Sequence, residues 1–417
     1  MTKEHPISVA IVGSGPSGLY AADALLRQKP HATIHIYERL PIPFGLVRSG
    51  VAPDHPGTKT VVRQFEKMME RPNVRFIGNV AVGVDIPLAN LRDAYDLVFI
   101  AIGTACDRRL GIPGEGLRGI YGSGAFTSWY NGHPDYAALD PVVGRRIAIV
   151  GMGNVALDIA RIIAQGPDAL ARTDISSSAL AILRESRTEH ITLFARGMPE
   201  TASFSPAELN GLAALPHISL TVDGDIPHHH PDPPTEKKLE ALRAVQASDG
   251  ALSIHLAFGR MPLAIEGDGR VERLLLRRAQ DGECETGLFD TVITAIGFEV
   301  SVIPDLPICD NHVACDDDGR VLPGLYALGW AKRGPSGTIP TNRQEAQKVV
   351  RQALANMRPS VAKDPNLALR HLTTAACPII DWDGWKRIDS HELRNGAREK
   401  LLTRDAFLCI AQGTLVL

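Results

Sequence analysis

The sequence predicts the α/β class, with two domains built on parallel sheets and one of them inserted into the other. Two short apolar segments, about 140 residues apart, are each followed by closely spaced glycines and a helical stretch, which predicts two βαβ units. Two further apolar runs that end in glycine, 97–104 and 291–297, predict buried strands where the chain passes between the domains. The expected division is 1–105 and 297–417 for the first domain and 106–296 for the inserted one.

The composition restricts the class of protein. At 417 residues the chain is long enough for two or three domains. Hydrophobic residues make up 44% and charged residues 22%, which is typical of a soluble globular protein and argues against disorder. The formal net charge of -3 argues against a general nucleic-acid binder, and no apolar run is long enough to span a membrane.

The six cysteines indicate a reducing compartment. None forms a Cys-x-x-Cys pair, and the closest two, Cys309 and Cys315, fit no common zinc pattern. We therefore expect reduced, mostly structural thiols, a cytoplasmic protein, and none of the dithiol chemistry of disulfide reductases. The first expected strand would leave no room for a secretory signal. Three adjacent histidines, 228–230, lie among prolines, and we expect a solvated loop rather than a metal site.

The first βαβ unit carries a complete dinucleotide-binding fingerprint. A strand at 8–12 leads into Gly13-x-Gly15-x-x-Gly18, a helix follows at 19–26, and a second strand at 33–37 ends in Glu38. Gly13 allows a tight turn, Gly15 allows backbone to approach a pyrophosphate, and Gly18 allows close helix–strand packing. Glu38 would accept hydrogen bonds from a ribose 2′-hydroxyl. This unit therefore predicts a Rossmann-like domain.

The second unit repeats the pattern with a different end. A strand at 145–150 is followed by Gly151-Met152-Gly153-Asn154, with Ala156 in the place of the third glycine, and by a helix at 157–164. The next strand, 190–195, is delayed by an insertion at 165–189, in which we expect an extra helix. It ends in Arg196, and a cation there suits a 2′-phosphate, which favours NADP over NAD. A solvated surface arginine is the alternative.

The second strand of the first unit ends in an acid, Glu38, and that of the second unit in a cation, Arg196, which predicts two different dinucleotides. The acid-ended site fits FAD, whose adenosine ribose carries no phosphate, and the arginine-ended site fits a nicotinamide donor. A binding module would have little reason to hold both, whereas a flavin reductase holds them so that hydride can pass from one to the other.

Several longer segments make the interpretation more specific. The sequence resembles the adrenodoxin reductase family of ferredoxin–NADP reductases from about residue 8 to 405, and the segments that carry the resemblance are 38–56, 129–131, 153–161, 171–175, 329–339, 383–389 and 398–400. The poorest region is 210–290. The resemblance implies an FAD flavoprotein that takes hydride from NADPH and passes electrons singly to a ferredoxin, for example one that serves a P450 or similar system.

The resemblance also implies site residues. It would place on FAD the residues Ser17, Glu38, Leu46, Val82, Trp330, Gly337, Thr338 and Ile339. It would place on the nicotinamide dinucleotide the residues Gly151, Met152, Gly153, Asn154, Arg196 and Glu208, with Gly337 nearby. Without the resemblance, Trp330 would be interpreted as a core tryptophan. Backbone N–H groups at the helix that follows Gly337 would face the flavin N1/O2 edge.

Two positions depart from the family's pattern. The usual pair of arginines is here Arg196-Gly197, and loss of one guanidinium predicts that NADH is accepted beside NADPH. An acidic residue often found three after Glu208 is here Gly211. His55 remains as the polar catalytic candidate near the isoalloxazine, where it could organise water or relay a proton; a loop-capping histidine is an equal alternative.

The expected partner is a ferredoxin, held by a local basic face, with no nucleic acid and no membrane span; a monomer is favoured. The candidate docking clusters are Lys332 with Arg333, Lys237 and Lys238 with Arg243, and Arg270 with Arg273, Arg277 and Arg278. The alternatives are a flavin monooxygenase, a glutamate-synthase-like reductase, which usually brings a cysteine-rich N-terminal segment, and a non-catalytic NAD(P) sensor.

Overall fold

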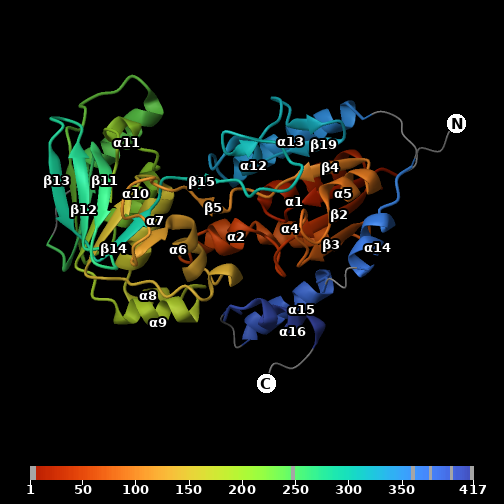
Figure 1. Cartoon of the computed structure of the whole chain (residues 1–417), viewed down its shortest axis with the longest axis horizontal. Coiled ribbons are helices and arrows are strands. Elements are labelled where there is room, and N and C mark those ends of the chain that lie inside the picture. Colours follow the sequence, from red (N-terminus) through yellow and green to blue (C-terminus); the bar gives the residue numbers. More distant parts are fainter. Residues whose placement is uncertain (1–5, 246–248, 358–361, 375–377, 395–397, 414–417) are drawn as a thin grey trace. The chain divides into compact units, whose positions relative to one another are not determined.

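The computed structural model describes residues 6–245, 249–357, 362–374, 378–394 and 398–413 (Figure 1). The chain divides into two compact units. The first comprises Met1–Val51, His55–Cys106 and Phe298–Leu417, and the second comprises Ala52–Asp54 and Asp107–Gly297. The divisions at 106/107 and 297/298 lie one residue from those expected from the sequence.

One short segment departs from the expected division. Residues 52–54 belong to the second unit, although residues of the first unit precede and follow them in sequence. Ala52 packs in the apolar cluster of the second unit, and the Asp54 carboxylate forms an ion pair with Arg161. Both contacts join residues far apart in sequence, so local patterns could not reveal them.

The first unit is built on a six-stranded sheet in the order β18-β19-β4-β1-β2-β3. All neighbouring pairs are parallel except β18 with β19. The strands are β1 Ser8–Val12, β2 Thr33–Glu38, β3 Val74–Gly78, β4 Leu97–Ile100, β18 Arg320–Leu322 and β19 Leu325–Ala327. Short strands complete the unit: β15 Phe298–Glu299, β16 Ile308–Cys309 and β17 His312–Val313.

Helices cover both faces of this sheet (Figure 1). They are α1 Pro16–Gln28, α2 Leu46–Ser49, α3 Pro56–Lys59, α4 Val62–Met69, α5 Leu88–Ala94, α12 Trp330–Arg333, α13 Ile339–Ala355, α14 Asn366–Thr374, α15 Trp382–Glu392 and α16 Arg404–Gln412. Ile11 joins the apolar cluster that contains α1 and α13, whereas Val12 joins the cluster that contains α5. Because successive side chains of a strand alternate, both faces are apolar, as expected for a parallel sheet.

The second unit is built on an all-parallel sheet in the order β6-β14-β7-β8-β10-β9. The strands are β6 Ile120–Gly122, β7 Arg146–Val150, β8 His190–Phe194, β9 Ile218–Asp223, β10 Leu252–Ala257 and β14 Thr291–Thr294. The helices are α6 Ser123–Tyr130, α7 Asn154–Ala164, α8 Pro167–Leu170, α9 Ser177–Glu185, α10 Pro206–Ala213 and α11 Pro233–Arg243, with 3-10 turns η1 Pro134–Tyr136 and η2 Pro199–Thr201. The helices and the sheet share one apolar cluster.

An antiparallel sheet covers the opposite face. It consists of β11 Arg260–Glu266, β12 Arg273–Arg278 and β13 Cys284–Leu288. Leu274 and Leu276 of β12 pack with Ala148 and Val150 of β7 in a second apolar cluster. Strand β5, Cys106–Asp107, spans the division between the units at 106/107.

The predicted α/β class with parallel sheets is confirmed. The expected insertion at 165–189 holds α8 and α9. The runs 97–104 and 291–297 end as strands earlier than expected, at Ile100 and Thr294, because the chain then leaves the sheet and reaches glycines with positive φ, Gly103 and Gly297.

The structure also bears on the expectations for the histidines, the cysteines and membrane-spanning helices. The three histidines 228–230 lie in the loop before α11. Five cysteines are free thiols, and Cys377 lies outside the described residues. In the described part of the chain, no helix combines the length and the apolarity that a membrane crossing requires.

Candidate cofactor sites

The first glycine turn stands at the carboxyl end of β1. Gly13 has a φ of 107°, and a Cβ there would lie 2.5 Å from the Ala101 carbonyl oxygen, so only glycine fits. A Cβ on Gly18 would lie 2.1 Å from the Gly13 oxygen, which is the close helix–strand approach expected from the sequence. In contrast, a Cβ on Gly15 would meet nothing within 4 Å.

Gly15 is therefore next to open space at the start of α1. It is the N-cap of this helix and supplies no side chain to bond the first N–H groups. Unpaired N–H groups and the positive end of the helix dipole form an anion site. The turn fits the pyrophosphate of a dinucleotide.

Glu38, at the end of β2, is fixed beside this turn. It is 8% exposed, and its Oε2 accepts hydrogen bonds from the Ser14 N–H at 3.0 Å and the Ser14 hydroxyl at 2.7 Å. Its Oε1 accepts one from the Leu40 N–H at 3.0 Å. Because a carboxylate offers about four acceptor positions, one position on Oε1 remains for a ribose hydroxyl.

The segment around Trp330 lies against the first glycine turn. Gly329 has a φ of 69°, and a Cβ there would lie 2.1 Å from the Ser17 hydroxyl, so this turn touches the start of α1. The Trp330 indole N–H donates to the Ser336 carbonyl at 2.9 Å, and the ring stacks on Phe298 with an interplanar angle of 11°. Trp330 is only partly buried, so the alternative of a core tryptophan is wrong.

The loop that follows Trp330 delivers a helix N-terminus. Gly337 has a φ of 77°, Thr338 is the N-cap of the 17-residue helix α13, and Ile339 is its first residue. A capping box between Thr338 and Thr341 fixes this end. The positive end of a long helix dipole thus stands where the resemblance expects the flavin's N1/O2 edge.

The remaining flavin candidates, Leu46 and Val82, and the catalytic candidate His55 differ from one another in exposure. Leu46 is 40% exposed, directly after Gly45, whose Cβ would lie 3.1 Å from the Gly15 Cα. Val82 is 8% exposed and packs in the apolar cluster on the α5 face, which was not expected from its implied role on FAD. His55, half-buried, is the N-cap residue of α3, and its side chain makes no capping bond to that helix.

The second glycine turn follows β7. Gly151 has a φ of 135°, and a Cβ there would lie 2.1 Å from the Ala295 oxygen. Gly153 is the N-cap of α7 without a side-chain bond, so this helix start is also open. Met152 is 6% exposed, and the Asn154 side-chain oxygen accepts from the Ser205 N–H at 2.7 Å. The turn fits a second pyrophosphate, and Asn154 connects it to the start of α10.

Arg196 follows β8 and is exposed. Within the described part of the chain, no hydrogen bond or ion pair is recorded for its guanidinium, so this cation is available to a 2′-phosphate. Gly197 beside it has no positive φ, and a Cβ there would lie 2.1 Å from the Thr201 hydroxyl.

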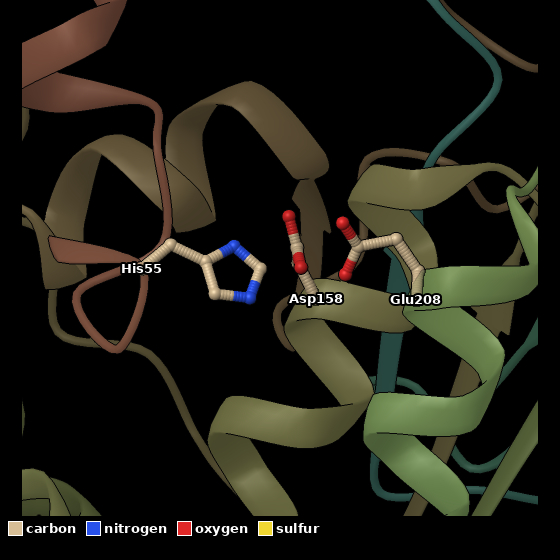
Figure 2. Close-up of side chains that lie close together, drawn as sticks. All are labelled: His55, Asp158 and Glu208. Carbon is tan, nitrogen blue, oxygen red and sulfur yellow. The ribbon is translucent and has the colours of Figure 1, made fainter. Parts of the chain in front are cut away.

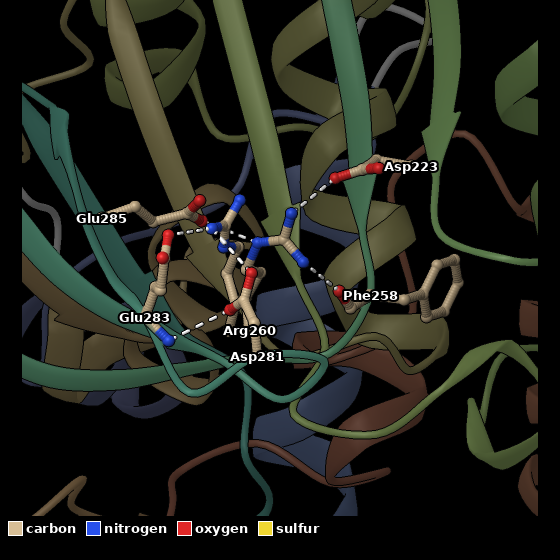
Figure 3. Close-up of polar contacts among 7 residues, drawn as sticks. Asp223, Phe258, Arg260, Asp281, Glu283 and Glu285 are labelled. Atoms are coloured by element: carbon tan, nitrogen blue, oxygen red, sulfur yellow. Dashed lines mark hydrogen bonds and ion pairs between the residues drawn. The ribbon is translucent and has the colours of Figure 1, made fainter.

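A second arginine, Arg260, which was not identified from the sequence, lies next to the end of β8. The Arg260 N–H donates to the Ala195 carbonyl at 2.8 Å, so the two arginines stand on neighbouring backbone segments. Figure 3 shows that the Arg260 guanidinium is already engaged, with Nη2 2.8 Å from Asp223 Oδ2 and Nε 2.7 Å from Glu285 Oε1. Arg260 therefore does not replace the guanidinium missing at position 197.

Buried charges surround the start of α7 and α10. Figure 2 shows the carboxylates of Asp158 on α7 and Glu208 on α10 turned toward each other; His55, also drawn, belongs to the first unit. Arg161, 5% exposed, pairs with Asp54 and with Asp158, the latter at 2.5 Å, and lies 3.9 Å from Glu208.

The proton balance of this group follows from its burial. Burial raises the pKa of Asp158 to about 8, and the charge of Glu208 and its hydrogen bond to Asp158 contribute to the increase. Asp158 therefore keeps its proton at neutral pH, next to the carboxyl of Glu208. The sequence analysis identified Glu208 but not Asp158 or Arg161.

Four arginines of the candidate docking clusters pair with carboxylates of their own unit. Arg333 pairs with Glu345, Arg243 with Glu236, Arg273 with Glu266, and Arg278 with Asp281 and Glu283. Lys332 and Lys238 donate to the backbone carbonyls of Asp317 and Glu200, so they keep their charge. Lys237, Arg270 and Arg277 are exposed, and their charges are available to a partner.

Comparisons with known proteins agree with this geometry. Residues 7–166 match the Pyridine nucleotide-disulphide oxidoreductase family. The chain is 35% identical to a mitochondrial NADPH:adrenodoxin oxidoreductase of Arabidopsis thaliana, over 98% of this chain and 96% of that protein. It is 36% identical to the cindoxin reductase of Citrobacter braakii, over 92% and 86%.

A solved structure extends the comparison to the fold. Mycobacterium tuberculosis FprA in complex with NADPH superposes with a TM-score of 0.91 at 33% identity, and the match covers 98% of this chain and 100% of that one. Sequence identity and fold agree over almost the full length. The chain therefore belongs to the adrenodoxin reductase family of ferredoxin–NADP reductases, oxidoreductases that use FAD and NADPH.

Proposed function

We propose that this chain is a ferredoxin–NAD(P)+ reductase that holds FAD in its first unit and NADPH, or less tightly NADH, in its second. The observation that carries the proposal is the pair of open glycine turns, of which one is followed by the fixed carboxylate Glu38 and the other by the free cation Arg196. Bound FAD supplies the chemistry, because it accepts a hydride from the nicotinamide and releases electrons one at a time.

The first unit's residues hold and tune the flavin. Glu38 binds the adenosine ribose, and the open N–H groups after Gly15 bind the pyrophosphate. The N-terminus of α13, capped by Thr338, places positive potential at the flavin's pyrimidine edge. That potential stabilises negative charge on the reduced ring and so favours hydride acceptance.

The second unit's residues select and orient the nicotinamide dinucleotide. Arg196 pairs with the 2′-phosphate, and without a second arginine at 197 the discrimination against NADH is weak. The raised pKa of Asp158 keeps its carboxyl protonated at neutral pH, so that it can donate a hydrogen bond to Glu208. This bond holds the Glu208 carboxyl, which the resemblance places on the nicotinamide dinucleotide.

His55 is proposed as the group that holds a proton or water for the flavin. Its place in the segment 38–56, which carries part of the resemblance, supports this role. The His55→Gln variant, whose side chain cannot exchange a proton, should be reduced by NADPH more slowly than the wild type. An unchanged rate would contradict the role.

The proposed electron acceptor is an acidic ferredoxin in a cytoplasmic electron-transfer chain, received by a monomer. The exposed charges of Lys237, Arg270 and Arg277 support a local dock, since the total charge of -3 does not attract an acidic partner. Reduction of the ferredoxin should slow steeply as salt rises, and Lys237→Ala should reduce that slope. A rate independent of salt would contradict docking by charge.

A side-by-side assay tests the whole proposal. The purified protein should be yellow, which a nucleotide sensor without flavin would not be. It should reduce cytochrome c through a ferredoxin with NADPH and, more weakly, with NADH. A monooxygenase would instead consume oxygen with an organic substrate. Absence of ferredoxin-dependent reduction with both nucleotides would overturn the proposal.

A further inference from the structure

The segment between β2 and α2 contains a strained residue. Phe44 has a φ of 81°, in the left-handed region that non-glycine residues rarely adopt. Its N–H donates to the Ser14 carbonyl at 3.1 Å, within the first glycine turn. The free energy of strain at one such residue is about as large as that of a tenfold change in a binding constant. Surrounding contacts must therefore hold Phe44 in this conformation.

Two tryptophans of α15 hold the Phe44 ring. Phe44 is 2% exposed, and its ring meets Trp385 edge-on at a centroid distance of 5.6 Å and Trp382 at 6.3 Å. Edge-to-face packing of aromatic rings fixes their relative orientation. The strained residue is thus packed against a helix that is more than 300 residues away in sequence.

An ion pair joins the same two segments. Arg48 of α2 is 8% exposed, and its Nη2 lies 2.6 Å from Oε1 of Glu392, which is 0% exposed. The Arg48 guanidinium carbon also lies 5.5 Å from the centre of the Trp385 ring, in a cation–π contact. Arg48 therefore contacts α15 both through its charge and through its flat face.

Glu392 is satisfied on both oxygens. It accepts from Arg398 Nη1 at 2.9 Å and from the Leu401 N–H at 3.0 Å, in addition to Arg48. Burial opposes ionisation of Glu392, but the neighbouring charges of Arg48 and Arg398 overcome it and hold its pKa below the usual range. A buried carboxylate with this many donors is a rigid anchor rather than a surface contact.

The anchored segment lies on the cofactor turn. A Cβ on Gly45 would lie 3.1 Å from the Gly15 Cα, so the backbone after Phe44 touches the pyrophosphate turn, and Leu46, placed on FAD by the resemblance, comes next. Helices α15 and α16 pack together (Figure 1). We propose that these two helices form a C-terminal brace that presses residues 44–49 onto the FAD turn, with Glu392 as the positioning residue.

The brace rests on the proposed function only in requiring that the first unit binds FAD. Its function is to prepare the site before FAD arrives, so that less ordering is needed on binding. Loss of the brace should therefore weaken FAD retention without touching any group that contacts the nucleotide of the second unit.

The test compares Glu392→Gln with Asp389→Asn in the full holoenzyme. Asp389→Asn removes the partner of Arg398 Nη2, at 2.8 Å, on the same helix but leaves the Arg48–Glu392 pair intact. Both variants should lower the melting temperature. Only Glu392→Gln should raise the FAD dissociation constant, by about tenfold or more, and alter the visible circular dichroism of the bound flavin. Arg48→Lys, which keeps the charge but loses the flat face, should give a smaller loss.

A double-mutant cycle completes the test. Arg48→Met with Glu392→Gln should weaken FAD binding no more than the worse single variant, because the pair acts as one unit. Additive losses, or equal FAD affinity in Glu392→Gln and Asp389→Asn, would overturn the brace. If Glu392→Gln does not fold, Arg48→Lys and Arg48→Met carry the same comparison. A wild-type protein that binds no FAD would instead overturn the proposed function itself.

Discussion

Restoring the second guanidinium at position 197 should shift the cofactor preference toward NADPH. Gly197→Arg places a cation beside Arg196, where the 2′-phosphate is expected. A hydrogen bond to a charged group contributes about 1.5–3 kcal/mol. Because Arg196 is exposed, solvent screening makes the lower end appropriate, and ~1.4 kcal/mol corresponds to tenfold. We expect the NADPH/NADH ratio of kcat/KM to rise by about tenfold.

The structure also predicts a side effect of this substitution. A Cβ at position 197 would lie 2.1 Å from the Thr201 hydroxyl, which now donates to the Met198 carbonyl at 2.8 Å. Thr201 must rotate, and loss of its bond costs about 0.5–1.5 kcal/mol. The backbone itself is not strained, since Gly197 has no positive φ. This loss lowers the stability of the second unit and affects both nucleotides equally.

Two controls separate the charge from the crowding. Gly197→Ala introduces the Cβ alone and should lower the melting temperature while leaving the NADPH/NADH ratio unchanged. Gly197→Arg combined with Thr201→Ala removes the clash and should retain the higher ratio. Steady-state kinetics with both nucleotides and thermal unfolding provide the measurements. An unchanged NADPH/NADH ratio in the double variant would refute the proposal that the 2′-phosphate binds at positions 196 and 197.

Three further outcomes follow from the second unit. Because burial raises the pKa of Asp158 to about 8 in the fold, above the value of about 3.8 in the unfolded chain, the free energy of unfolding should fall as pH rises between these values. Chemical denaturation of Asp158→Asn should show a flatter pH profile. Gly151→Ala, whose Cβ would clash with the Ala295 oxygen at 2.1 Å, should destabilise the unit and abolish nucleotide binding measured by calorimetry. Gly211→Ala, with nothing within 4 Å in α10, should raise stability by about 0.5–1 kcal/mol. A melting temperature lowered by Gly211→Ala would show that this helix position is not open.

Local chemistry made much of the fold predictable. The glycine turns at Gly13 and Gly151 require positive φ and close backbone approach, and such requirements leave a pattern within a few residues. The long crossover at 165–189 was predicted because a delayed strand needs an insertion. Strand ends were less accurate, since the sequence does not show where a chain leaves a sheet.

The site's supporting contacts could not be predicted in the same way. Arg48 and Glu392 are 344 residues apart, and Arg161 and Asp54 are 107 apart. Each partner alone resembles an ordinary charged surface residue. Only the fold shows that these charges are buried and paired. The same holds for Asp158, whose position on α7 gives no indication of Glu208 on a different helix.

Glu38 and Arg196, the residues proposed to recognise the two nucleotides, differ in more than charge. Glu38 is buried, is held by three hydrogen bonds from its own unit, and lies beside the turn that residues 44–49 approach. Arg196 is exposed and carries no recorded partner in the described part of the chain. A prepared site loses little freedom on binding, whereas an exposed arginine must be ordered each time a ligand arrives. The first arrangement suits a cofactor that stays bound through many turnovers, and the second suits a substrate that must leave after each one. FAD should therefore remain with the protein through purification and NADP+ should not, so that the structural asymmetry matches the different roles of a resident flavin and an exchanging nicotinamide.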